Sequence, residues 1–282
     1  MDENFNNIFS WNVAGLRARL KPEEGYTSSL MRALFSQVSD CGHGYKYFDF
    51  VCLQETKCCE TDVKLPCEIK IRYPYRFWNS SKGTTQRKGF SGTTIWCSRP
   101  PIRKLDTPDF DEEGRIVALE FKNFILVNVY LPNSQTFESD RYHFRHEWNE
   151  KFYLYIEEIK KCKEVIICGD LNVAHQDIDI TNPKQKKNKV AGFYNLERCD
   201  FESLLQSSKL VDVFRKFNAN EQVSTYWSNF LKSERKKDNG WRIDYFLMSQ
   251  ELFDKNCVES IKILMDILGS DHCPVVLKLN FN

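Results

Sequence analysis

The chain has 282 residues, of which 41% are hydrophobic and 28% charged, and its formal net charge at pH 7 is +1. This composition is ordinary for a globular protein with one large core, and the charge excludes a strongly basic chain, so a nucleic-acid surface must be a local patch. The 11 cysteines form no CxxC pair and have no zinc-like spacing with histidine, which favours a reducing compartment over a disulfide framework.

No targeting or linker segment is evident in the sequence. The first residues lack a basic stretch followed by an apolar run, and no apolar run approaches 18 residues. We therefore expect a soluble intracellular protein, nuclear or cytoplasmic, that does not enter a membrane. Because no Pro/Gly/Ser-rich linker, low-complexity tract or repeat interrupts the chain, we expect a single catalytic domain over residues 1–282.

Apolar runs bounded by turn residues predict strands, and apolar residues spaced three or four apart predict helices. The expected strands cover residues 8–13, 48–54, 89–98, 115–121, 124–130, 165–168, 224–231, 241–248 and 275–279, with 224–231 and 241–248 as a hairpin-like pair. Helices are expected over 28–38, 140–162 and 201–217. Strand-rich halves with a few helices in the connections predict an α/β fold of two packed sheets with helices outside.

Polar residues recur at the ends of the expected strands. They are Asn12, Glu55, Tyr130, Asp170 with Asn172, and Asp271-His272 ahead of the last strand. Asp170 and Asn172 lie two apart, so on an extended backbone both side chains point into one site. An isolated Gly-Asp would be interpreted as a turn cap, but the recurrence predicts one polar cleft where the strand ends gather.

This set of side chains suits metal-assisted hydrolysis of a phosphodiester. Glu55 and Asp271 are hard oxygen ligands of the kind that Mg²⁺ takes, together with phosphate and water. Asp170 is a candidate base for the attacking water. Asn172 would orient that water.

Two further side chains are expected to stabilise the charge that develops on the phosphoryl group. Tyr130 and His272 would donate hydrogen bonds to its oxygens. Asp244 is placed to orient His272, because a carboxylate partner fixes the tautomer and favours the charged ring.

Six segments resemble, in order, the motifs of the exonuclease III family, the class II apurinic/apyrimidinic endonucleases. They are Ser10–Ala18, Leu53–Lys57, Val129–Asn133, Gly169–His175, Trp241–Phe246 and Gly269–Pro274. The resemblance implies a four-layer α/β sandwich of two mixed sheets flanked by helices. It also implies a Mg²⁺-dependent (Mn²⁺ as an alternative) DNA repair enzyme that cuts double-stranded DNA 5′ to an abasic site, leaves a 3′-OH, and has accompanying 3′–5′ exonuclease or 3′-end-cleaning activity. A monomer is expected, with other base excision repair enzymes as possible partners.

The resemblance also assigns roles to individual residues. The reactive and metal-binding group would comprise Asn12, Glu55, Tyr130, Asp170, Asn172, Asp271 and His272, with Asp244 as the partner of His272. Asn182, Arg17 and Arg141 would contact DNA or lie near it; for Arg141 a solvated helix face is the alternative. Lys184, Lys186, Lys187 and Lys189 form a basic run that suits either phosphate contacts or an exposed loop.

An apolar pocket for the abasic sugar is expected from Tyr226, Trp241 and Ile243. The two-residue spacing puts Trp241 and Ile243 on one face, and a hairpin would bring Tyr226 beside them. By the resemblance, these positions form the family's sugar pocket. Simple core packing is the alternative interpretation for Tyr226.

Two positions depart from the family pattern. Ala14 stands where the family usually has Asp or Asn, so the resemblance supports the metal position at Glu55 and leaves a second metal open. Phe9 stands where the animal enzyme has its redox-active cysteine, so that redox function is not carried over. A nuclear-targeting tail is not carried over either.

Two other functions compete with the repair nuclease. A related phosphoesterase, such as an inositol-phosphate phosphatase or deoxyribonuclease I, would share Glu55, Asp170, Asn172 and the Ser-Asp-His segment. It would not share Leu131-Pro132-Asn133 or Trp241-Arg242. An inactive DNA-binding or scaffold protein is the other alternative. Retention of the acid, base and histidine opposes it, because unpaired buried carboxylates are costly.

Overall fold

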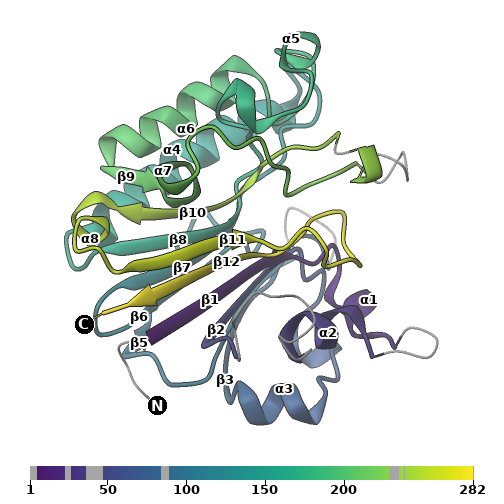
Figure 1. Cartoon of the computed structure of the whole chain (residues 1–282), viewed down its shortest axis with the longest axis vertical. Helices are drawn as coiled ribbons and strands as arrows, with labels where there is room; N and C mark the ends of the chain where they lie inside the picture. The colour runs from purple at the N-terminus through teal and green to yellow at the C-terminus, as the bar shows by residue number, and fades with distance from the viewer. Residues whose placement is uncertain are drawn as a thin grey trace.

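The computed structural model describes residues 5–22, 27–35, 47–83, 89–228, 235–237 and 239–281. Two six-stranded sheets lie face to face (Figure 1). The first has the order β11-β12-β1-β2-β4-β3, and the second β5-β6-β7-β8-β10-β9. The first consists of β1 (Phe5–Asn12), β2 (Phe50–Gln54), β3 (Tyr75–Asn79), β4 (Thr93–Cys97), β11 (Val258–Ile263) and β12 (Val275–Asn280). The second consists of β5 (Arg103–Lys104), β6 (Ile116–Glu120), β7 (Ile125–Tyr130), β8 (Val165–Asp170), β9 (Leu210–Asp212) and β10 (Asp244–Ser249).

Helices cover the outer face of each sheet. The first sheet packs against α1 (Leu16–Leu20), α2 (Ser29–Phe35) and α3 (Cys67–Arg72), and the second against α4 (Asp140–Lys160) and α6 (Asn195–Ser207). Shorter helices are α5 (Pro183–Lys186), α7 (Val213–Phe217) and α8 (Gln250–Phe253). The predicted four-layer α/β sandwich is therefore confirmed. Among the described residues, no helix is long and apolar enough to span a membrane.

The alternation of side chains in β8 explains its uninterrupted apolar sequence. Ile166 and Cys168 belong to the core between the two sheets, whereas Val165 and Ile167 pack in the core beneath α4 and α6. A strand buried on both faces needs apolar residues at every position. The strand continues to Asp170, so its carboxylate stands at the end of a buried element.

Strand pairing brings the polar ends of four strands together. β1 and β2 run parallel with Asn12 opposite Gln54, and β7 and β8 run parallel with Tyr130 opposite Asp170. Gln54 Nε2 also donates to Asn128 Oδ1 at 2.7 Å, from one sheet to the other. Because parallel strands end at the same edge, the carboxyl ends of both pairs meet at one edge of the sandwich.

Two expectations about local structure were wrong. The helix expected over 201–217 is divided, because Lys209 adopts a left-handed φ of 47° after α6, and the next residues pair with β10 as β9 before α7 begins. The hairpin expected from 224–231 and 241–248 is reduced to a bridge between Tyr226 and Trp241, since β10 pairs with β8 and β9. Residues 36–38 and 229–231 of the predicted elements lie outside the described residues. Elements that the sequence pattern did not predict include β3, β5, β11 and α3.

Candidate active site

A cleft of about 350 Å³ opens where the polar strand ends meet. Both sheets and the loops between them contribute to its walls. The lining residues are Glu55, Tyr130, Asn133, Asp170, Asn172, Val190, Ala191, Gly192, Tyr226, Ser228, Trp241, Ile243, Asp271 and His272. One end of the cleft is rich in carboxylate and amide groups, and the other is aromatic and aliphatic.

Asn12 ties the two sheets together beneath the cleft. Its Nδ2 donates to Glu55 Oε1 at 3.1 Å and to Asp170 Oδ2 at 2.8 Å, and its Oδ1 accepts from the Ala14 backbone N–H at 3.0 Å. Asn12 is fully buried at the end of β1. With its oxygen engaged in this way, Asn12 fixes the spacing of two carboxylates that belong to different sheets.

Glu55 presents a carboxylate that attracts a cation. Lys57 Nζ lies 2.8 Å from Glu55 Oε2, and 46% of the Lys57 side chain is exposed. Burial alone would raise the pKa of Glu55, but Lys57 and the Asn12 amide more than offset it and hold the pKa below its ordinary value. The half-exposed Lys57 ammonium thus occupies a position where positive charge is electrostatically favoured, which fits the expectation of a metal ion held by Glu55.

Asp170 sits next to a rigid amide network. The Asn172 N–H donates to Asp170 Oδ1 at 2.9 Å, Asn172 Nδ2 donates to the Leu131 carbonyl at 2.9 Å, and Asn133 Nδ2 donates to Asn172 Oδ1 at 3.0 Å. Burial raises the pKa of Asp170 to about 7; His272 opposes this shift, whereas the charges of Asp244 and Glu55 add to it. A carboxylate whose pKa lies near neutrality can both take up and release a proton.

His272 is held in its charged form by carboxylates on two sides. Its Nδ1 lies 2.8 Å from Asp244 Oδ2, and its Nε2 lies 3.8 Å from Asp170 Oδ2. Burial alone would lower the pKa of His272, but Asp244 and Asp170 raise it to about 10. The ring therefore carries a proton on Nε2 at neutral pH and faces the cleft as a donor.

The cluster of Asp170, Asp244 and His272 has ligand atoms within 4.8 Å of one another. His272, one of the predicted metal ligands, offers a lone pair to a metal only when its ring is not doubly protonated. Glu55, Asp170 and Asp271 remain as the predicted ligands with carboxylates in the cleft, and Asp271 Oδ1 accepts from Ser270 Oγ at 3.2 Å. Hard oxygen donors of this kind fit Mg²⁺.

Tyr130 lies over a buried arginine. The Arg115 guanidinium is 4.5 Å from the centre of the Tyr130 ring, and its Nη1 donates to the Tyr130 carbonyl at 2.8 Å. Arg115 is itself paired with Glu113 at 2.6 Å. Burial raises the pKa of the Tyr130 hydroxyl, with Glu55 and Asp170 adding to the shift, so the hydroxyl stays protonated and can donate.

The apolar end of the cleft contains the three residues expected for a sugar pocket. The Tyr226 ring centre lies 6.0 Å from that of Trp241 and 4.8 Å from that of His272, and Ile243 lines the same space. Gly192 faces Trp241 so closely that a Cβ at this glycine would lie 3.1 Å from the indole. The pocket is therefore narrow and opens directly beside His272.

Residues 9–272 match the model of the Endonuclease/Exonuclease/phosphatase family. The chain belongs to this family. An exodeoxyribonuclease of Bacillus subtilis is 37% identical over 276 residues, which cover 97% of this chain and 99% of that protein. A DNA-(apurinic or apyrimidinic site) endonuclease of Dictyostelium discoideum is 36% identical over 291 residues, with coverage of 100% and 73%.

Solved structures agree with the assignment to the Endonuclease/Exonuclease/phosphatase family. An AP endonuclease from Leishmania major is 25% identical with a TM-score of 0.78, covering 100% of this chain and 90% of that one. An AP endonuclease from Archaeoglobus fulgidus, 23% identical, has the same fold with a TM-score of 0.78 and coverage of 97% and 99%. The predicted resemblance to exonuclease III-type AP endonucleases is confirmed, and with it the prediction of a hydrolytic nuclease.

Three residues predicted to contact DNA lie outside the lining of this family member's cleft. Arg17 is exposed and its Nη2 reaches the Lys57 carbonyl at 3.4 Å. Arg141 forms a two-pronged pair with Glu113, with both N–O distances 2.7 Å. Asn182 is exposed, with a left-handed φ of 56° just before α5. Their proposed contacts would therefore be with DNA that extends beyond the cleft.

Sequence reasoning missed other members of the cleft. Asn133 was noted only as part of a motif, although its position just beyond the polar end of β7 was an available signal. The segment 190–192 carried no signal, because its place in the wall depends on its approach to Trp241. Ser228 was read only as part of a strand.

Proposed function

We propose that this protein is a DNA repair hydrolase that cleaves the phosphodiester 5′ to an abasic site in double-stranded DNA, requires Mg²⁺ and leaves a 3′-OH. The observation that carries this proposal is the continuity of one cleft, in which Asp170 and His272 adjoin a narrow apolar pocket. The names of the curated relatives support the substrate class. We further propose that the chain acts as a single domain and a monomer.

The ion would be held by Glu55 and Asp271, with Asp170 facing it from the second sheet. When bound, Mg²⁺ supplies Lewis-acid polarisation of a phosphoryl oxygen and charge neutralisation. The Lys57 ammonium would move away from Glu55, which its exposure permits. Asn12 holds Glu55 and Asp170 at a fixed separation throughout, because it donates to both carboxylates.

The protein's own groups would take up the proton of the attacking water, and the departing 3′-oxygen would take its proton from solvent. Asp170, with its pKa near 7, accepts a proton from the attacking water. Asn172 orients Asp170 through its backbone N–H and would orient that water. His272 Nε2 and the Tyr130 hydroxyl line the cleft in protonated form and would donate hydrogen bonds to the phosphoryl group, where they would stabilise the charge that develops. Asp244 keeps His272 charged and in one orientation.

Selectivity for an abasic nucleotide would come from the pocket of Tyr226, Trp241 and Ile243. A pocket closed on one side by Gly192 accepts a flipped deoxyribose and excludes a complete nucleotide. Flipping is also easiest where no base is stacked or paired. The basic residues around α5, among them Lys186 over the Trp241 ring at 5.6 Å, would meet the phosphate backbone.

The decisive experiment compares two 5′-labelled duplexes that differ at a single nucleotide, one with tetrahydrofuran and one intact. We expect Mg²⁺-dependent incision only 5′ to the tetrahydrofuran, complete loss in EDTA, and a 3′-OH that a polymerase can extend. Equal cleavage of both duplexes would contradict the proposal, as would release of phosphate from inositol phosphates instead. Trp241→Ala should reduce the ratio of the two incision rates more than it slows cleavage of the damaged duplex.

An accompanying 3′–5′ exonuclease activity is favoured by the exodeoxyribonuclease name of the Bacillus subtilis relative. A terminal nucleotide of a frayed 3′ end would then present its phosphodiester to the carboxylates of the cleft while its base stays outside the pocket of Tyr226, Trp241 and Ile243. A recessed 3′ end, labelled at its 5′ end, should then be shortened stepwise in Mg²⁺. Undigested ends under conditions of complete abasic-site incision would restrict the protein to the endonuclease reaction.

A further inference from the structure

A second hollow, of about 130 Å³, lies at the edge of the sandwich opposite the cleft. It is formed where β1 begins, where the chain leaves β4, and at the turn between β6 and β7. Its lining residues are Asn6, Arg99, Pro100, Ile102, Phe121, Lys122, Asn123 and Phe124. Asn6 and Asn12 stand toward opposite ends of β1, about 20 Å apart at the rise of an extended strand. The hollow is therefore distinct from the cleft.

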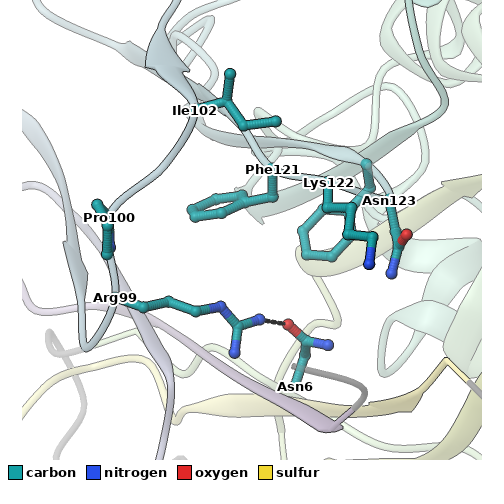
Figure 2. A pocket seen from close by; sticks show the side chains of 8 residues that line it. Asn6, Arg99, Pro100, Ile102, Phe121, Lys122 and Asn123 are labelled. Carbon is teal, nitrogen blue, oxygen red and sulfur yellow. Dashed lines mark hydrogen bonds between the residues drawn. The ribbon is translucent and has the colours of Figure 1, made fainter. Parts of the chain in front are cut away.

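Arg99 is held rigidly at this hollow by uncharged partners. Its Nη2 donates to Asn6 Oδ1 (Figure 2). Its guanidinium lies 5.0 Å from the centre of the Phe50 ring. The aromatic contact and the amide acceptor fix the plane of the guanidinium without neutralising it. A fixed guanidinium loses less conformational entropy when it binds a ligand than a free one does.

Among the residues that the structure describes, no carboxylate balances the positive charge of the hollow. In the described part of the chain, neither Arg99 nor Lys122 has a carboxylate within ion-pair distance, and no Asp or Glu lines the hollow. Arg99 differs in this respect from the buried Arg115 and Arg242, which are both paired with carboxylates. Figure 2 shows Lys122 and Asn123 extending their polar ends toward the same space as Arg99.

The surroundings define the kind of ligand. The buried Phe121 and Phe124 give the hollow an apolar floor, against which a hydrogen bond from the guanidinium to an anion is stronger than in open water. A volume of about 130 Å³ suits a tetrahedral anion, whereas a nucleoside attached to it would extend outside past the exposed Ile102. We infer that this hollow binds a phosphate-class anion through Arg99, Lys122 and Asn123, either free phosphate or the terminal phosphate of a nucleotide.

The inference does not depend on the proposed function, and its test measures no DNA cleavage. Because phosphate can also enter the catalytic cleft, the signal must come from Arg99 itself. The Nε–H resonance of Arg99 in the ¹⁵N-labelled full chain is assigned as the peak that R99Q lacks. Inorganic phosphate and deoxyadenosine 5′-monophosphate are titrated separately in EDTA, with sodium chloride at matched ionic strength as the reference.

We expect a saturable shift of the Arg99 resonance by phosphate, with a Kd of about 1 mM or below. K122Q, which retains the reporting arginine, should weaken the Kd about tenfold, the usual worth of a charged hydrogen bond. R103Q, which removes an exposed neighbouring arginine paired with Glu120, should leave the Kd unchanged.

The two titrants distinguish the source of the anion. A tighter Kd for the monophosphate identifies the terminal phosphate of a nucleotide, and equal values identify free phosphate. A shift that does not saturate, an equal shift with chloride, or an unchanged Kd in K122Q would each overturn the inference. Thermal unfolding of each variant shows that it is folded before its titration is interpreted.

Discussion

Asp170 in the cleft and Asp179 behind it meet opposite electrostatic surroundings. In the cleft, burial raises the pKa of Asp170 to about 7, with Asp244 and Glu55 adding to the effect against His272. Behind the cleft, burial would also raise the pKa of Asp179, but Arg242 and Arg215 hold it below its ordinary value. The same residue type is thus left short of positive charge in one region and fully paired in the other.

This difference in pKa distinguishes the side chains proposed to react, such as Asp170, from the buried ion pairs that hold the cleft in shape, such as that of Asp179. Arg242 lies between Trp241 and Ile243 in sequence, and its guanidinium binds Asp179 at 2.7 Å and Asp212 at 2.7 Å. Arginine does not lose its proton in the physiological pH range. The arginine frame, meaning Arg242 with Asp179 and Asp212, therefore keeps its charges at a pH where Asp170 in the cleft gains or loses a proton. The ion pairs of Arg242 with Asp179 and Asp212 hold Trp241 and Ile243, the pocket residues on either side of Arg242. The carboxylates of the cleft, in contrast, can still bind a cation or a proton.

The largest effect is expected from Asp170→Asn. An amide cannot accept the proton of the attacking water, so turnover on an abasic duplex should fall roughly 10²–10⁴-fold. Binding of DNA should persist, since the phosphate backbone supplies most affinity. Single-turnover kinetics and a binding titration measure the two quantities. The exposed Asp266→Asn is the control, and loss of binding instead of turnover would make Asp170 a structural residue.

Arg242→Met should test how much the buried ion pairs of Arg242 contribute to stability. Removing the guanidinium leaves Asp179 and Asp212 without their shared partner in the interior, which should lower the free energy of unfolding by about 3–5 kcal/mol. Urea denaturation gives the value. Arg103→Met, which removes an exposed arginine from Glu120, should leave the midpoint unchanged. Equal midpoints for both variants would show that the buried pairs contribute no more than a surface pair.

Glu55→Gln should raise the Mg²⁺ concentration that the enzyme requires while leaving the fold largely unchanged. The neutral side chain keeps its size but loses its attraction for a cation, so the Mg²⁺ concentration for half-maximal incision should rise on the order of 10–100-fold. Incision rates over a magnesium series measure the shift. Glu60→Gln, an exposed change, should reproduce the wild-type curve. A wild-type curve for Glu55→Gln would remove Glu55 from the metal site.

The smallest effect is expected from the ion pair of His146 with Asp200, in which the histidine can lose its charge as the pH rises. His146 Nδ1 lies 2.9 Å from Asp200 Oδ2 and joins α4 to α6, and this hydrogen bond raises the pKa of His146 above 6.5. A raised pKa means that the added stability is complete below about pH 6.5 and is lost as the pH rises through the folded-state value.

With 36% of the His146 side chain exposed, the contribution should stay below about 1 kcal/mol. The difference in unfolding free energy between wild type and His146→Gln should therefore shrink from pH 5.5 to 8.5. A difference that stays constant would assign the contribution of His146 to packing instead of charge.

The strand ends of the cleft were predictable because each follows a buried apolar run. The run from Val165 to Cys168 indicates its strand directly, and Asp170 and Asn172 follow at a spacing that points both side chains one way. The break at Lys209 was not predictable from an apolar pattern, since it depends on pairing with β10. The arginine frame was equally hidden, because Arg242 meets Asp179 and Asp212 across long stretches of sequence.

The pairing of β1 with β12 has a consequence for synthesis of the protein. Residues 5–10 of β1 pair with residues 275–280 of β12, and the loop that carries Asp271 and His272 immediately precedes β12. A ribosome makes β1 more than 260 residues before β12, so β1 lacks this neighbour until residues 275–280 have emerged. A nascent chain stopped before residue 270 has Asp170 and Glu55 but neither the imidazole nor the final carboxylate. The group of side chains proposed for catalysis is therefore complete only after the loop before β12 has been synthesised.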